Sequence, residues 1–128
     1  FRAVAGEDAK VLTGDWSERW GHDAIAQLWQ GAGPCPDGIF CGSDQIARGV
    51  IDALRERTVR VPEDVAVVGF DDIPMAQFAK PPLTTVAQDT KRAGELLVEA
   101  LLHQIRHQPV SSMMLPARVV VRRSCGAP

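Results

Sequence analysis

Three apolar runs of the chain each reach a glycine and then end in polar residues. They are residues 11–15 (VLTGD), 39–44 (IFCGSD) and 65–72 (VAVVGFDD). Each run has the length and apolar character of a buried strand, so its polar end would lie at the carboxyl edge of a sheet. Ligands of open parallel sheets bind in the crevice beyond that edge. The repetition therefore predicts one binding site with an acidic lining.

Individual residues at these strand ends have side chains suited to a polar organic ligand. Trp16 offers a flat apolar face and one N–H donor, although an indole packed beneath a loop would occupy the same position. We expect Asp44 to cap the following helix and Ser43 to keep its hydroxyl for the crevice, although capping explains both residue types. The adjacent carboxylates of Asp71 and Asp72 repel each other, so one is expected to face a ligand; a loop-capping turn is the alternative.

The sequence has no motif for covalent, phosphate or metal chemistry. It contains no GxGxxG or P-loop pattern, no nucleophile elbow, and no His, Cys and Asp set at metal-ligand spacing. We therefore expect no cofactor, no metal and no enzymatic activity. An enzyme fragment that uses Asp15 and Asp71 as an acid–base pair is the alternative that these residues leave open.

The elements that must position these residues alternate between strand and helix. An amphipathic helix is predicted from Ser17 to Trp29, ended by Gly31 and Gly33, and a second helix covers residues 43–57. Helices of this length between strands imply right-handed crossovers. The predicted fold class is α/β, with a parallel sheet flanked by helices on both faces.

The second half of the chain has a different pattern. Residues 73–82 contain three prolines and read as a loop, and residues 83–86 read as a short extended segment. A longer helix is predicted from Asp89 or Thr90 to about His107, with an apolar stripe from Ala93 to Ile105. Two strand-like segments follow, 112–115 and 118–123, separated by Pro116. The order predicts a chain that leaves one sheet and returns to it.

Composition narrows the class of partner. The 128 residues suit one domain, and the 14 basic and 16 acidic residues are interspersed, with a net charge of −2. Such a surface has no electrostatic footprint for nucleic acid or an anionic membrane. The basic cluster 118–123 reads as a charged strand end and is given no functional role. Three cysteines without paired spacing predict a reduced, cytoplasmic compartment.

Five short motifs, in this order and spacing, resemble the C-terminal part of the LacI/GalR (lactose/galactose repressor) family of bacterial transcription regulators. They are GDWS at 14–17, FCGSDQIA at 40–47, VPEDV at 61–65, VGFDD at 68–72 and PLTTV at 82–86. The resemblance extends over nearly the whole chain. It implies a periplasmic-binding-protein-like domain of type I, with two lobes, three crossovers and a small effector in the cleft between the lobes.

The resemblance also divides the chain and assigns roles. Residues 1–88 would belong to the C-terminal lobe, 89–115 would enter the N-terminal lobe as a helix and a strand, and 116–128 would return. The resemblance implies four ligand-binding positions: an aromatic that stacks on the effector, a residue that hydrogen-bonds its polar edge, a carboxylate that clamps hydroxyls or ring nitrogens, and a crossover residue that reaches the cleft. They correspond, in that order, to Trp16, Ser43, Asp71 and Gln88.

Two surfaces and a partner follow from the same resemblance. A homodimer would form through Gln45–Arg57 and Ile73–Pro82, and DNA would be bound only by a helix-turn-helix headpiece outside this chain. Since the three strand ends carry no Lys or Arg, an uncharged sugar or sugar derivative is favoured as effector. A periplasmic sugar-binding protein of a transporter is the rival interpretation. Without the first lobe, the stripe of Ala93–Ile105 is expected to dock on a neighbouring chain or on the rest of the C-terminal lobe.

Overall fold

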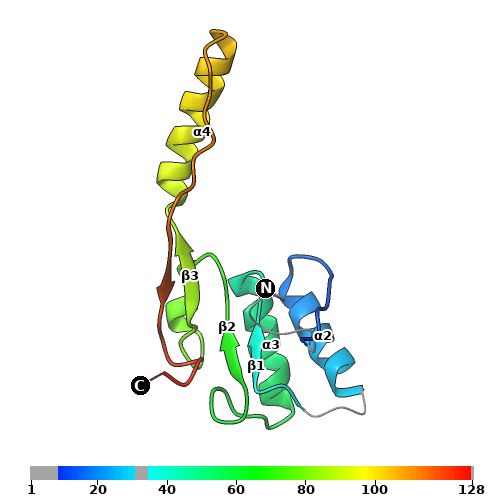
Figure 1. Ribbon diagram of the computed structural model, residues 1–128. Helices are drawn as coiled ribbons and strands as arrows, with labels where there is room; N and C mark the ends of the chain where they lie inside the picture. Colours follow the sequence, from blue (N-terminus) through cyan, green and yellow to red (C-terminus); the bar gives the residue numbers. More distant parts are fainter. Residues whose placement is uncertain (1–8, 31–34, 128) are drawn as a thin grey trace.

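The computed structural model describes residues 9–30 and 35–127. Its elements, in chain order, are α2 (Glu18–Gln30), β1 (Gly38–Phe40), α3 (Asp44–Glu56), β2 (Ala66–Val68), the 3-10 turn η1 (Ala76–Phe78), β3 (Thr85–Gln88), α4 (Thr90–Ile105) and β4 (Ala117–Val120). Figure 1 shows the strands side by side, with α3 next to β1 and α2 beyond α3, while α4 projects away from this body.

The strands form a continuous arrangement in the order β1, β2, β3, β4. β1 pairs in parallel with β2, and parallel bridges then join Val68 to Thr84 and Asp71 to Ala87. β4 pairs antiparallel with β3. The predicted alternation of strand and helix is therefore confirmed from β1 onward. The parallel strands place the residues that follow β1 and β2 at one edge, and β3 runs to the same edge.

The core lies between α3 and the parallel strands. Its buried apolar side chains come mainly from α3 and the β2 segment: Ala47, Val50, Ile51, Ala53, Leu54, Val65 and Val67. α2 adds the fully buried Ile25 and packs closely on α3. A Cβ on Gly21 would lie 2.1 Å from the carbonyl oxygen of Ile46, and one on Gly49 would lie 1.8 Å from that of Glu18. Glycine at both positions lets the two helix backbones approach.

Two strands expected from the sequence are not formed. Residues 9–15 and 108–116 have no regular structure, so the predicted strands at 11–14 and 112–115 are wrong. A strand persists only where its N–H and C=O groups pair with a neighbour, and neither segment has such a neighbour among the described residues. The loop predicted at 73–82 contains η1. The helix end predicted at Gly31 and Gly33 lies outside the described residues.

α4 projects away from the sheet and from α2 and α3 (Figure 1). It begins at Thr90, just after β3 ends, and continues away from the sheet. None of its residues is buried, and Leu97 and Ile105 are 71% and 65% exposed. The expectation that the apolar stripe docks on the rest of this lobe is therefore wrong, because the helix extends from the strand instead of folding back. Docking on a neighbouring chain stays a prediction.

Candidate functional site

The carboxyl ends of β2 and β3 bring two of the predicted binding residues together. Asp71 follows β2 and Gln88 ends β3. The side-chain Nε2 of Gln88 donates a hydrogen bond of 3.3 Å to Oδ1 of Asp71, and both residues are exposed. A carboxylate keeps several acceptor directions after one bond is made, and the amide adds a carbonyl oxygen. The pair can therefore accept hydrogen bonds from neighbouring hydroxyl groups of one ligand.

Trp16 lies at the neighbouring strand end, beside the residues that follow β1. A Cβ on Gly42 would lie 3.3 Å from Cζ3 of the Trp16 ring, so the indole rests against the backbone there. Its side chain is nevertheless 70% exposed. An aromatic face beside polar groups is suited to stacking on the apolar face of a sugar-like ring. Trp16, which precedes α2, thus lies against the connection between β1 and α3 that contains Ser43.

Ser43 and Asp44 have local roles that differ from the predicted ones. Ser43 is the N-cap of α3, with extended backbone, and its Oγ accepts a hydrogen bond of 3.2 Å from the amide of Ile46. The prediction that Asp44 is the cap is wrong, because the helix begins at Asp44 itself. Ser43 is only 5% exposed. Since the cap uses its oxygen as an acceptor, ligand binding by Ser43 stays a prediction that would rest on its O–H as donor.

Asp44 is a buried carboxylate that is hydrogen-bonded to β3 and to the turn after β2. It is 2% exposed, and it accepts hydrogen bonds from the hydroxyl of Thr85 at 2.5 Å and from the amide of Ile73 at 2.8 Å. The pKa of Asp44 is raised above its ordinary value, mainly by burial. The two hydrogen bonds lower it, and the charges of Asp71 and Asp72 add to the rise. Asp44 therefore fixes the turn after β2 against β3, beneath the exposed Asp71.

The turn that carries Asp71 has an unusual backbone. Asp71 and Asp72 have φ angles of +107° and +53°, in a region that residues with a side chain rarely occupy. Each such residue costs on the order of 1–3 kcal/mol and persists only where its surroundings fix it. The amide of Asp71 donates a hydrogen bond of 2.9 Å to the carbonyl oxygen of Val86. This bond sets Asp71 at the edge of β3, next to Gln88.

Arg122 contacts this turn, although it belongs to the basic cluster 118–123, for which no functional role is predicted. Its Nη2 donates a hydrogen bond of 2.7 Å to Oδ1 of Asp72, and both side chains are 20% exposed. Its Nη1 donates to the carbonyl oxygen of Leu83 at 2.8 Å. Arg118 and Arg123 flank the same run of valines, so no pattern in the sequence distinguishes Arg122 from them.

Other chemistry is limited at this edge. Cys41 is buried, and burial raises the pKa of its thiol to about 12, which leaves no reactive thiolate near neutral pH.

Within residues 9–30 and 35–127, no group of three His, Cys, Asp or Glu residues is placed to hold a metal ion. In the same residues, no helix is both long enough and apolar enough to cross a lipid bilayer.

The sequence profile of the periplasmic binding protein-like domain matches residues 2–125. The chain belongs to this family. Its periplasmic-binding-protein-like α/β fold, with a parallel sheet and flanking helices, is therefore confirmed. A ribose operon repressor and a lac repressor are among the proteins that the chain resembles, so the resemblance to the C-terminal part of a LacI/GalR effector-binding domain is confirmed as well.

Curated relatives are longer than this segment. The chain is 39% identical over 109 residues to the ribose operon repressor of Escherichia coli strain K12, a match that covers 84% of the chain and 32% of that protein. The chain thus spans about a third of the length of the curated relatives it matches.

Solved structures give the same result. A complex of the transcriptional regulator CelR with cellobiose is 34% identical, with a TM-score of 0.85 over 96% of this chain and 39% of that chain. A lac repressor dimer bound to operator and the anti-inducer ONPF is 34% identical, with a TM-score of 0.80 over 89% of this chain and 40% of that one.

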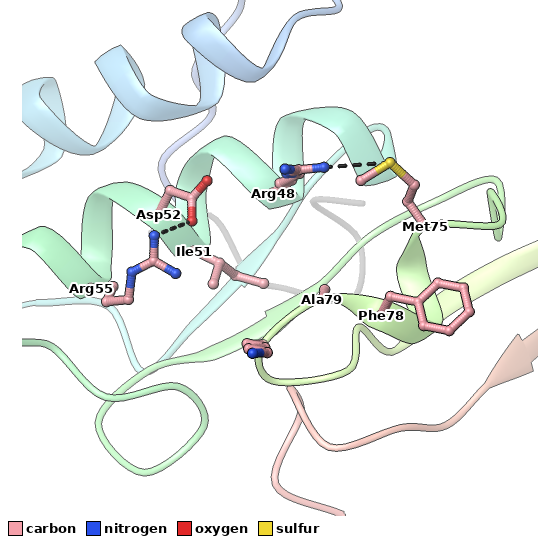
Figure 2. A pocket seen from close by; sticks show the side chains of 8 residues that line it. Arg48, Ile51, Asp52, Arg55, Met75, Phe78 and Ala79 are labelled. Carbon is pink, nitrogen blue, oxygen red and sulfur yellow. Dashed lines mark hydrogen bonds and ion pairs between the residues drawn. The ribbon is translucent and has the colours of Figure 1, made fainter.

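A hollow of about 190 Å³ lies on another face of this periplasmic binding protein-like segment, between α3 and the η1 segment (Figure 2). In this hollow, Nη1 of Arg48 lies 3.4 Å from the sulfur of Met75, and Arg55 pairs with Asp52 at 2.8 Å. The lining is Arg48, Ile51, Asp52, Arg55, Met75, Phe78, Ala79 and Lys80. None of the four predicted ligand-binding residues takes part, so this surface is separate from the strand ends.

Proposed function

We propose that this segment of a LacI-type repressor binds an uncharged sugar or sugar derivative at the edge formed by Asp71, Gln88 and Trp16. The observation that carries the proposal is the hydrogen-bonded pair of Asp71 and Gln88, exposed at the end of adjacent strands. Hydrogen-bond acceptors beside an exposed aromatic face are the combination that a polyhydroxylated ring requires. The CelR relative bound to cellobiose supports this ligand class.

The cleft would be completed by a second lobe. In this proposal residues 1–88 form the C-terminal lobe, 89–115 enter the N-terminal lobe and 116–128 return. The exposed apolar stripe of α4 and the return of β4 to β3 support this division. Effector binding would favour one lobe arrangement and so change the affinity of a DNA-binding headpiece in the cytoplasm.

The homodimer is proposed to form through Gln45–Arg57 and Ile73–Pro82. The hollow between α3 and η1 lies on this surface, and Phe78 and Met75 on it are 74% and 49% exposed. An isologous contact would pair each such surface with its copy. The lac repressor relative was solved as a dimer, which supports this arrangement. No catalytic activity is part of the proposal.

The test is a calorimetric titration of the full-length protein with a panel of mono- and disaccharides that includes ribose and cellobiose. At least one sugar is expected to bind, and Asp71→Ala is expected to weaken it about tenfold or more, because a charge-assisted hydrogen bond is lost. The matched control is Asp37→Ala, an exposed carboxylate before the amino end of β1, at the opposite edge of the sheet. Unchanged affinity in Asp71→Ala contradicts the assignment.

A further inference from the structure

The ion pair between Arg122 and Asp72 connects the segment after β4 to the turn that carries Asp71. We propose that Arg122 is a positioning residue for effector binding, holding the turn through Asp72 so that Asp71 faces the ligand. The inference rests on the proposed function of Asp71, and it concerns a residue that does not itself contact the ligand.

The contacts of Arg122 are directional. Its two terminal nitrogens donate to different acceptors, to Oδ1 of Asp72 at 2.7 Å and to the carbonyl oxygen of Leu83 at 2.8 Å. Its backbone amide also donates to Oγ1 of Thr84 at 2.8 Å. A planar guanidinium can satisfy two acceptors in fixed directions, whereas a lysine ammonium on a flexible stem cannot reproduce that fork. With only 20% of each side chain exposed, the pair is partly protected from solvent screening.

The turn requires this support at two ends. Asp71 and Asp72 both have positive φ angles, so neither holds its conformation by itself. The amide of Ile73 is fixed by Asp44, at 2.8 Å, while the carboxylate of Asp72 is fixed by Arg122. Removing Arg122 leaves Asp44 as an anchor, so the turn can change conformation without loss of the core. Asp71 lies immediately before the released residue and would move with it.

The same contacts connect the turn at Asp71 to β3 and to the segment that follows β4. Asp71 contacts β3 through Gln88, and its neighbour Asp72 contacts the segment after β4 through Arg122. The register of β3 and β4 places Gln88 opposite Ala117. The position of the Asp71 carboxylate therefore depends on β3 and on the returning chain together, and Arg122 provides the second connection.

The experiment measures affinity for the tightest-binding sugar of the panel in the full-length protein. Arg122→Ala is expected to weaken binding about tenfold, and Arg122→Lys is expected to recover only part of this loss. In the Asp71→Ala background, Arg122→Ala is expected to change affinity by less than about twofold, since it acts through Asp71. Arg123→Ala removes the same charge from the neighbouring exposed position and is expected to leave affinity unchanged.

Four outcomes decide between the alternatives. Wild-type affinity in Arg122→Ala overturns the positioning role. An equal loss of affinity from Arg122→Ala with and without Asp71 also overturns it, because a general structural effect does not depend on Asp71. If Asp71→Ala binds normally, or if no sugar of the panel binds, the proposed function fails first. Should Arg122→Ala not fold, Asp72→Asn replaces it, because this substitution removes the charge and keeps the side-chain shape.

Discussion

The hydroxyl of Ser124 donates a hydrogen bond of 2.6 Å to the carbonyl oxygen of Val67, a residue of β2. The hydroxyl oxygen of Ser124 also accepts a hydrogen bond of 2.8 Å from the amide of Thr84, and the amide of Val67 donates to the carbonyl oxygen of Ser124 at 2.8 Å. Ser124 is fully buried. The returning chain therefore lies beside β2, at a level that β3 does not reach. Ser124 joins it there to Val67 and Thr84.

Replacing Ser124 with Ala is expected to lower the free energy of unfolding by about 2–4 kcal/mol, because it leaves a buried amide and a buried carbonyl without their side-chain partner. Urea unfolding of the full-length protein, followed by circular dichroism, measures the change. Ser112→Ala, at an exposed position, is the control and is expected to stay within about 0.5 kcal/mol of wild type. A similarly small effect at Ser124 would show that the bridge contributes little.

Two helix glycines are expected to respond to alanine with opposite signs. Gly49→Ala places a Cβ 1.8 Å from the carbonyl oxygen of Glu18, so α2 and α3 must separate, and we expect a loss of about 3 kcal/mol or more. Gly94→Ala in α4 meets nothing within 4 Å, so it is expected to add about 0.5–1 kcal/mol through helix propensity. Thermal or urea unfolding of both variants measures the difference. Equal effects would contradict the close contact at Gly49.

The helices and their order were predictable because apolar spacing is a local property. The amphipathic stripe after Ser43 places Val50, Ile51 and Leu54 on one face, and α3 buries that face. The strands at 11–14 and 112–115 were not predictable in the same way, because a strand also needs a neighbouring strand to pair with. The sequence shows the apolar run, but it does not show whether a neighbouring strand is present to pair with it.

The structure brings together two of the residues that the sequence singled out as binding candidates, but the sequence did not indicate their contacts. Asp71 and Gln88 were assigned separately and prove to be hydrogen-bonded to each other. Ser43 and Asp44 are both good N-cap residues, so the choice between them depends on a one-residue difference in where α3 begins. The role of Arg122 depends on a contact across 50 positions of the chain, which no local pattern indicates.

Protonation of Asp64 is expected to lower the free energy of unfolding at acidic pH. Hydrogen bonds from the side chain and backbone of Arg60 hold the pKa of Asp64 at about 2, below the ordinary value of 3.8. The native carboxyl therefore binds its proton at lower pH than the unfolded one, so its stabilising effect is present above pH 3.8 and is lost as the pH falls through about 2.

The measurement compares urea midpoints of wild type and Asp64→Asn from about pH 5 down to about pH 3. The midpoint of the variant is expected to be lower at the upper end of this range, and the difference is expected to shrink as the pH falls. Arg60→Ala removes the partner and should show the same trend. A difference that stays constant over the range would contradict the role of the ion pair.

The proposed dimer surface can be tested at a residue that is apolar and exposed. Phe78 is 74% exposed beside the hollow between α3 and η1, so burying it against a second copy would remove a large apolar side chain from water. Phe78→Asp places a charge in that contact and is expected to convert a dimer of the full-length protein into monomers, as measured by sedimentation velocity. Val11→Asp, at a position 51% exposed and outside this surface, is expected to remain dimeric. A dimer that persists in Phe78→Asp, or a wild type that is monomeric at the same concentration, would exclude this surface as the interface.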